Sequence, residues 1–110
     1  MLPFRVLQEA RRELLEAAHW YKDEDGLALA QAFGAAYREQ LSRARKLPQS
    51  GAPVGPMPAD IALDVRSFLF KRFPYKLVYA AAPDGIIVVA VAHQRRRPFY
   101  WITRLDNVDP

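Results

Sequence analysis

Cysteine is absent from this chain of 110 residues. Disulfide bonds, thiolate zinc sites and cysteine nucleophiles are therefore excluded, and a reducing cytosol is the expected compartment. The longest apolar run, Ile86 to Ala92, has seven residues and is too short to span a membrane as a helix. Residues 1–9 also lack the apolar core of a signal peptide. We therefore expect a soluble, cytoplasmic protein.

Motifs for cofactor chemistry are absent as well. The sequence has no glycine-rich phosphate loop, no acidic pair and no serine-nucleophile motif. Of its two histidines, His19 has no second ligand at a suitable spacing, so we expect neither a metal nor a cofactor. A hydrophobic fraction of 51% still permits a real core, and the length fits one domain over residues 1–110.

Positive charge is present in excess, and it is concentrated in the second half of the chain. Residues 60–104 contain eight basic and three acidic residues, whereas residues 1–59 contain eight basic and seven acidic residues. This bias is compatible with nucleic acid or with an acidic protein as the partner.

Hydrophobic spacing predicts a helical hairpin over about residues 8–46. After a short extended segment at Phe4 to Leu7, a helix begins at Gln8 and ends before Gly26, which suits a left-handed cap. A second helix is predicted for 27–46. Each has an apolar stripe at spacings of three and four: Ala10, Leu14, Ala17, Ala18 and Tyr21 on the first, and Leu29, Phe33, Ala36, Tyr37, Leu41 and Ala44 on the second.

A sheet is predicted for about residues 64–104, after a linker at 48–58 with four prolines and two glycines. Val65 to Phe70 is the first strand, and the period of two continues through residues 73–81. The fold class is therefore α+β, with an N-terminal strand and a helical hairpin packed on a small antiparallel sheet.

The turn Pro83-Asp84-Gly85 predicts a hairpin with a three-residue loop, in which the glycine takes a left-handed conformation. In that register the cross-strand pairs are Tyr79–Val89, Leu77–Val91 and Tyr75–His93. A two-residue loop would instead place His93 on the Lys76 face.

One face of this hairpin is apolar but small, and we expect it to be open. It carries Val78, Ala80, Val88, Ala90 and Ala92. An uncovered apolar strip usually marks a contact site. The alternative is that residues 98–105 fold back over it.

The end of the hairpin gathers cations and rings, in the run from His93 through Arg95-Arg96-Arg97 to Phe99-Tyr100-Trp101. With other positions, this run resembles the RelE/ParE superfamily of toxins from type II toxin–antitoxin systems. The resemblance rests on Ala10, Glu13, Leu14, Ala17, Trp20, Tyr21, Phe33, Val65, Arg66, Arg72, Phe73, Pro74, Tyr75, Tyr79, Ala90, Val91, His93, Arg96, Pro98, Tyr100 and Trp101.

The resemblance implies the same fold and a partner, a small antitoxin that lies on the toxin and holds it inactive. The residues expected to bind it are Trp20, Tyr21, Val78, Ala80, Val88 and Ala90. The alternative for Trp20 and Tyr21 is a place in the core.

Two branches of the superfamily imply different targets. ParE-like members block DNA gyrase and are not known as hydrolases, and the His93-x-x-Arg96 ending with the long helical hairpin favours this branch. The residues that would contact the target are Arg95, Arg96, Arg97, Phe99, Tyr100 and Trp101, because Arg, Tyr and Trp dominate interface energies. The alternative for Tyr100 and Trp101 is that they close the edge of the core.

RelE-like members cut messenger RNA in the ribosome, and this is the second hypothesis. Here His93 would be the base or acid, Tyr75 would stack a base or donate a proton, and Arg66, Arg72 and Arg96 would hold the phosphate. The alternative is that His93 only contacts Tyr75 and that the arginines end a strand. The sheet has only Lys71 and Lys76 as lysines, and little chain follows Trp101, which disfavours this branch.

Overall fold

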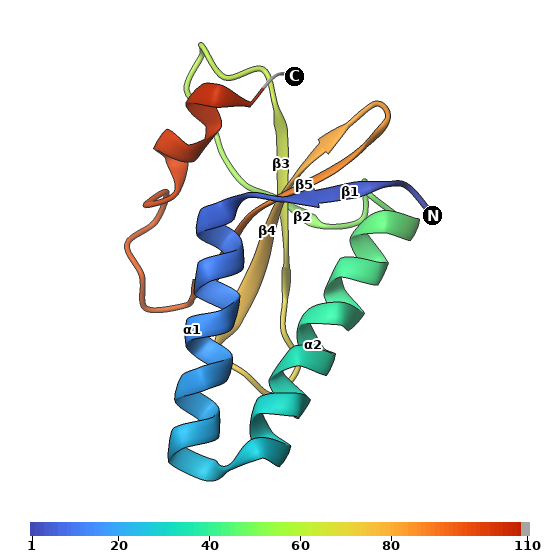
Figure 1. Cartoon of the computed structure of the whole chain (residues 1–110). Coiled ribbons are helices and arrows are strands. Elements are labelled where there is room, and N and C mark those ends of the chain that lie inside the picture. Colours follow the sequence, from blue (N-terminus) through green and yellow to red (C-terminus); the bar gives the residue numbers. More distant parts are fainter. Residues whose placement is uncertain (109–110) are drawn as a thin grey trace.

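A computed structural model describes residues 1–108 of the chain (Figure 1). In order, its elements are β1 (Phe4–Val6), α1 (Gln8–Asp25), α2 (Leu27–Lys46), β2 (Ala52–Pro53), β3 (Asp64–Leu69), β4 (Tyr75–Ala82), β5 (Gly85–His93) and a 3-10 helix (Ile102–Asn107). The strands form one sheet in the order β1-β5-β4-β3-β2. The predicted α+β fold is confirmed, although the sheet is mixed because β1 pairs with β5 in parallel.

The helical hairpin follows from the apolar spacing of the sequence. Gly26 separates the helices with φ at 93°, and its N–H donates to the Lys22 carbonyl at 2.9 Å, so the predicted helix end at this glycine is confirmed, although its ψ of 174° differs from that of a left-handed helical cap. Both helices turn their apolar stripes toward one face of the sheet, where Phe33 and Tyr79 are fully buried. Within residues 1–108 no helix is long and apolar enough to cross a membrane.

The turn of the β4–β5 hairpin differs from the prediction. Ala82 pairs directly with Gly85, so the turn has two residues and the predicted three-residue loop is wrong. A bulge near Val89 adds one residue to β5 further along. This extra residue offsets the shorter turn, and Tyr75 therefore still pairs with His93, as predicted.

The bulge also changes which side chains share a face. Tyr79 pairs with Val88 rather than with Val89, and Val78 pairs with Ala90. Val88 therefore packs on the helices, whereas Val89 and Ala90, adjacent in sequence, both lie in the cluster on the opposite face.

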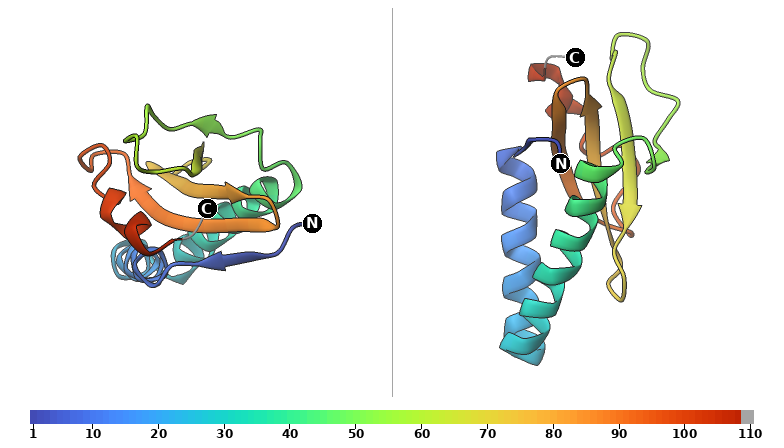
Figure 2. Two further views of the ribbon diagram at one scale, coloured as in Figure 1. Left: turned by 90° about the horizontal axis from the view of Figure 1, so that it is seen from above. Right: turned by 90° about the vertical axis from the view of Figure 1, so that its right-hand side faces the viewer.

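That opposite face is covered by the chain itself, so the expectation of an open apolar strip is wrong. Val78, Ala80 and Ala90 are 0% exposed and Ala92 is 1% exposed, while Val88, also predicted for this strip, is buried on the helix side instead. The covering side chains come from the proline-rich loop and the C-terminal segment: Val54, Met57, Ile61, Leu63, Trp101, Leu105 and Val108. Figure 2 shows the helices and this loop on opposite sides of the sheet. The alternative, in which the chain folds back over this face, is the observed arrangement.

The C-terminal segment also ends the sheet earlier than predicted. The strands stop at His93, not near residue 104, and residues 102–107 form the 3-10 helix instead. Its apolar side chains, Leu105 among them, supply the missing cover for the small residues of the sheet.

Gly85 serves a close approach of two strands rather than a left-handed turn. Among the glycines of residues 1–108, only Gly26 has a positive φ. A Cβ atom at position 85 would lie 2.8 Å from the Pro3 carbonyl oxygen, which accepts a hydrogen bond from the N–H of Ile86 at 3.1 Å. Glycine therefore allows β1 to join the sheet.

We predict that Gly85→Ala destabilises the protein, because the added methyl group must push β1 away from β5. The expected loss is about 1–3 kcal/mol of unfolding free energy, measured by urea denaturation. Gly34→Ala is the control: there a Cβ meets only the flexible end of Arg38, and the change should stabilise α2 by about 0.5–1 kcal/mol. Equal stability of the Gly85→Ala variant and the parent would contradict this account.

Candidate functional site

Glu13 on α1 joins three parts of the fold that are distant in sequence. Its Oε1 accepts hydrogen bonds from the Val91 backbone N–H at 3.1 Å and from Arg104 Nη1 at 2.8 Å. Its Oε2 accepts from the Tyr100 hydroxyl at 2.6 Å and from Arg104 Nη2 at 3.0 Å. We call Glu13, Tyr100 and Arg104 the Glu13 hub. It fastens the C-terminal segment to α1 and β5.

The Glu13 hub is largely shielded from water, so a charge there is favourable only when its partners are present. The side chains of Arg104 and Glu13 are only 14% and 16% exposed. Burial, together with the hydrogen bond to Glu13, raises the pKa of Tyr100 well above that of a free tyrosine, so the phenol remains a donor. Burial alone would lower the pKa of Arg104, but the Glu13 carboxylate raises it overall. The ion pair with Glu13 therefore stabilises the charged form of Arg104 in this largely buried position.

A cleft of about 240 Å³ opens beside the hub, between α1 and the end of β5. It brings together five residues that the sequence suggested for function, along with four others. Its lining is Glu13, Glu16, Ala17, Trp20, Tyr75, Val91, His93, Arg96 and Tyr100.

His93 is held within this cleft by two contacts. Its ring meets the Tyr75 ring edge-on, with centroids 5.0 Å apart, and its Nδ1 accepts the Arg95 backbone N–H at 3.0 Å. With Nδ1 as an acceptor, the proton of the neutral ring lies on Nε2. Nδ1 would have to give up this backbone hydrogen bond before it could take a proton from a substrate. This arrangement suits a structural contact better than a general base.

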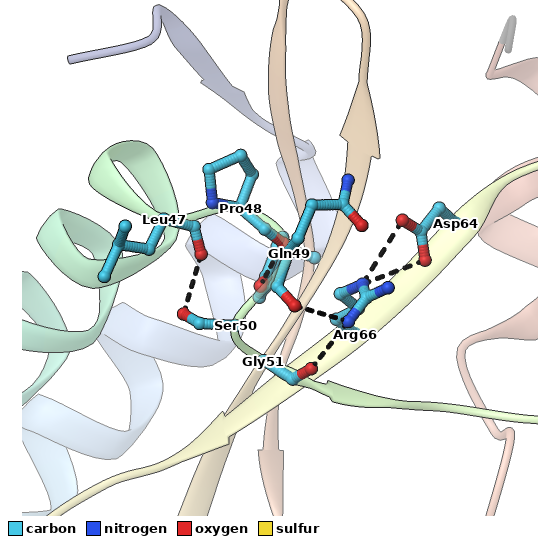
Figure 3. A network of polar contacts seen from close by, with 8 residues as sticks. Leu47, Pro48, Gln49, Ser50, Gly51, Asp64 and Arg66 are labelled. Atoms are coloured by element: carbon cyan, nitrogen blue, oxygen red, sulfur yellow. Dashed lines mark hydrogen bonds and ion pairs between the residues drawn. The ribbon is translucent and has the colours of Figure 1, made fainter.

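Arg66 is held away from His93 by a different network (Figure 3). Its Nε donates to Asp64 at 3.0 Å, and its Nη1 donates to the carbonyls of Gln49 and Gly51 at 2.6 and 3.0 Å. Arg66 of β3 pairs with Tyr79 of β4. Tyr79 lies four residues along β4 from Tyr75, the partner of His93. Arg66 and His93 are therefore separated by roughly 13 Å along the strand direction.

The remaining two arginines of the ribonuclease hypothesis differ in position, since Arg72 lies outside the cleft of His93 and Arg96 lines it. Arg72 lies in the β3–β4 turn with φ at 72°, and its guanidinium lies 5.5 Å from the centre of the Phe73 ring. Arg96 is exposed and lies 4.0 Å from the centre of the Tyr100 ring. Only Arg96, Tyr75 and His93 of that set line one cleft.

The segment predicted to contact a target divides into an exposed part and a buried part. Arg95, Arg96 and Arg97 are exposed, and we call residues 95–97 the arginine loop. Trp101 is only 2% exposed, so its predicted surface contact is wrong and it closes the core instead. Phe99, with φ at 61°, lies against it, with ring centroids 5.6 Å apart.

The two aromatic residues predicted to bind an antitoxin also differ from each other. Trp20 is 56% exposed on α1 and lies near Leu15, which is 58% exposed. Tyr21 instead packs between Phe33 and Phe73, with ring centroids 5.3 and 5.0 Å away. Tyr21 is thus a core residue.

Sequence reasoning missed the role of the Glu13 hub. In the sequence, Glu13 stands out only as one of the positions that carry the family resemblance. Arg104 is a lone cation near the end of an apolar segment, which was a usable signal for a buried ion pair. Within residues 1–108 no group of three histidine, aspartate or glutamate side chains is placed to hold a metal ion.

Comparison with known proteins identifies the family of this chain and a solved structure with a similar fold. Residues 4–98 match the family described as the ParE toxin of the type II toxin–antitoxin system parDE. A solved chain titled "Chromosomal ParDE TA system from P. aeruginosa" superposes with a TM-score of 0.68 at 17% identity, covering 84% of this chain and 96% of that chain. No curated protein sequence matches.

We predict that Glu13→Ala destabilises the protein by about 2–4 kcal/mol, because it leaves the Arg104 charge and the Tyr100 hydroxyl without their acceptor. Urea denaturation measures the change. Glu16→Ala, an exposed carboxylate on the same helix, is the control and should stay within about 0.5 kcal/mol of the parent. A similar effect of both substitutions would show that the hub does not hold the segment.

Proposed function

The chain belongs to the ParE toxin family of type II toxin–antitoxin systems, and we propose on this premise that it inhibits growth by binding DNA gyrase. We propose further that a cognate antitoxin neutralises it, and that it acts in the cytoplasm as a single domain. Membership confirms the predicted resemblance to the ParE-like branch of the RelE/ParE superfamily.

The arginine loop carries this proposal. It presents three exposed guanidinium groups next to the end of β5, without a carboxylate in the loop itself. Its two flanks are fixed: the Arg95 N–H bonds to His93, and the chain after Phe99 is anchored by the buried Trp101. Arginine on a rigid base loses little entropy when it binds, which favours an interface role.

Binding rather than hydrolysis is supported by the dispersal of the candidate catalytic groups. Arg66 is engaged by Asp64 and two loop carbonyls, and Arg72 lies in the β3–β4 turn. His93 has its Nδ1 occupied by a backbone donor. A ribonuclease needs a base and phosphate-holding cations around one atom. Of the candidate cations, only Arg96 lines the cleft of His93, which supports binding over hydrolysis.

For the antitoxin, the surface that supports binding is the exposed pair Trp20 and Leu15 on α1. The sheet residues first assigned to it lie beneath the helices or the C-terminal segment. A Trp20→Ala toxin should therefore bind its antitoxin more weakly by calorimetry, whereas Leu47→Ala, equally apolar and exposed on the loop after α2, should not.

We predict that replacing Arg95, Arg96 and Arg97 together with Gln weakens inhibition of gyrase supercoiling by at least about tenfold, because three interface cations are lost. The matched control replaces Arg11, Arg12 and Lys22, exposed on α1, with Gln and removes the same charge. If both triple variants lose inhibition equally, only net charge matters and the arginine loop is not the contact.

His93→Ala separates gyrase inhibition from RNA cleavage. The variant should keep inhibiting supercoiling, because no proton transfer by His93 is required. Primer-extension mapping in a translating extract should show intact message with the parent protein. Cleaved message together with normal supercoiling would overturn the proposal in favour of a ribosome-dependent endoribonuclease.

A further inference from the structure

A second cleft, of about 340 Å³, lies on the opposite face of the sheet from the helices. Its floor is formed by Lys76 of β4 and Ala92 of β5, which pair directly, and by Ser67 of β3, which lies one row further in on the same face. One wall is the loop around Pro53 to Gly55, and the other is the segment 94–101. The small side chain of Ala92 leaves room above the floor.

The charge of this cleft has one sign. Its cations are Lys76, Arg96 and Arg97, and none of the lining residues, all within 53–101, is Asp or Glu. None of these three cations forms an ion pair within the described part of the chain. The cleft beside the Glu13 hub, by contrast, contains two carboxylates. Three cations that line one cleft raise the local concentration of anions.

The same cleft offers rings and a hydroxyl group. Phe99 and Tyr100 belong to its lining, together with the hydroxyl of Ser67. One face of Tyr100 is already occupied by Arg96, which leaves Phe99 as the ring for stacking. Cations for a phosphate beside an aromatic ring for a base are the combination that binds nucleotides. The volume lies within the range of small-molecule sites, which begins at about 300 Å³.

We propose that this cleft binds a nucleotide, with the phosphate between Lys76, Arg96 and Arg97 and the base against Phe99. The site shares Arg96 and Arg97 with the arginine loop, but it needs no second protein. The nucleotide is either free or part of a nucleic acid strand. Binding is all that is claimed, and no bond in the ligand is broken.

Calorimetry on the full-length protein tests this with four probes: inorganic phosphate, adenosine, adenosine 5′-monophosphate and a short single-stranded oligonucleotide. The monophosphate should bind at least about tenfold more tightly than phosphate or adenosine, because both contacts are made together. Its affinity should fall with added salt. Tighter binding of the oligonucleotide than of the monophosphate would identify a strand as the source of the nucleotide, and the reverse would identify a free nucleotide.

Lys76→Met keeps the aliphatic stem and removes the charge, so it should weaken the monophosphate about tenfold. Lys71→Met is the matched control, because Lys71 is exposed outside the cleft and already pairs with Glu39 at 2.7 Å. Phe99→Leu should weaken the monophosphate but not inorganic phosphate, and thermal melting checks that each variant is folded. Equal weakening by Lys76→Met and Lys71→Met, or equal affinity for phosphate and monophosphate, overturns the proposal.

Discussion

The half-buried carboxylate of Glu13 is the contact on which the rest of this structure depends. It accepts hydrogen bonds from β5, Tyr100 and Arg104, and these donors lie 78, 87 and 91 residues away in sequence. A charge in this position stabilises the fold only while its partners are present, because an unpaired buried charge is strongly unfavourable. The hub therefore fixes the C-terminal segment against α1, and that segment in turn covers the second face of the sheet. The C-terminal segment also contributes residues to the lining of both clefts.

Tyr100 and Arg96 form the boundary between two clefts of different character. On the side of α1, the cleft contains Glu13 and Glu16 beside Trp20 and His93. On the opposite side, the cleft contains cations and no carboxylate. The stacking of Arg96 on Tyr100 links the two, since both residues line both clefts. A ligand in either cleft would contact this shared pair.

Family membership establishes a toxin of a type II system, and for its action we propose recognition rather than chemistry. The exposed arginine loop is the cationic surface on which this proposal rests. Two arginines of the ribonuclease hypothesis, Arg66 and Arg72, lie outside the cleft of His93. Arg66, the clearest case, closes the proline-rich loop onto β3 through Asp64 and two carbonyls (Figure 3). Some cations of this protein therefore stabilise the fold, as Arg66 does, whereas others, such as the arginine loop, are exposed at the surface.

The sequence alone determined the elements that depend on residue patterns within a single segment. The apolar period of 3.6 gave both helices, Gly26 gave their break, and the period of two gave the strands up to His93. It also placed the arginines and rings at the end of the hairpin. Tertiary structure decided whatever depends on distant partners. The bulge near Val89 moved Val88 to the helix side, and the return of residues 98–108 buried Trp101 and the small apolar face. The sequence does not specify either of these, because the position of a bulge and the partner of a buried ion pair are selected by packing between segments that are adjacent only in the folded chain.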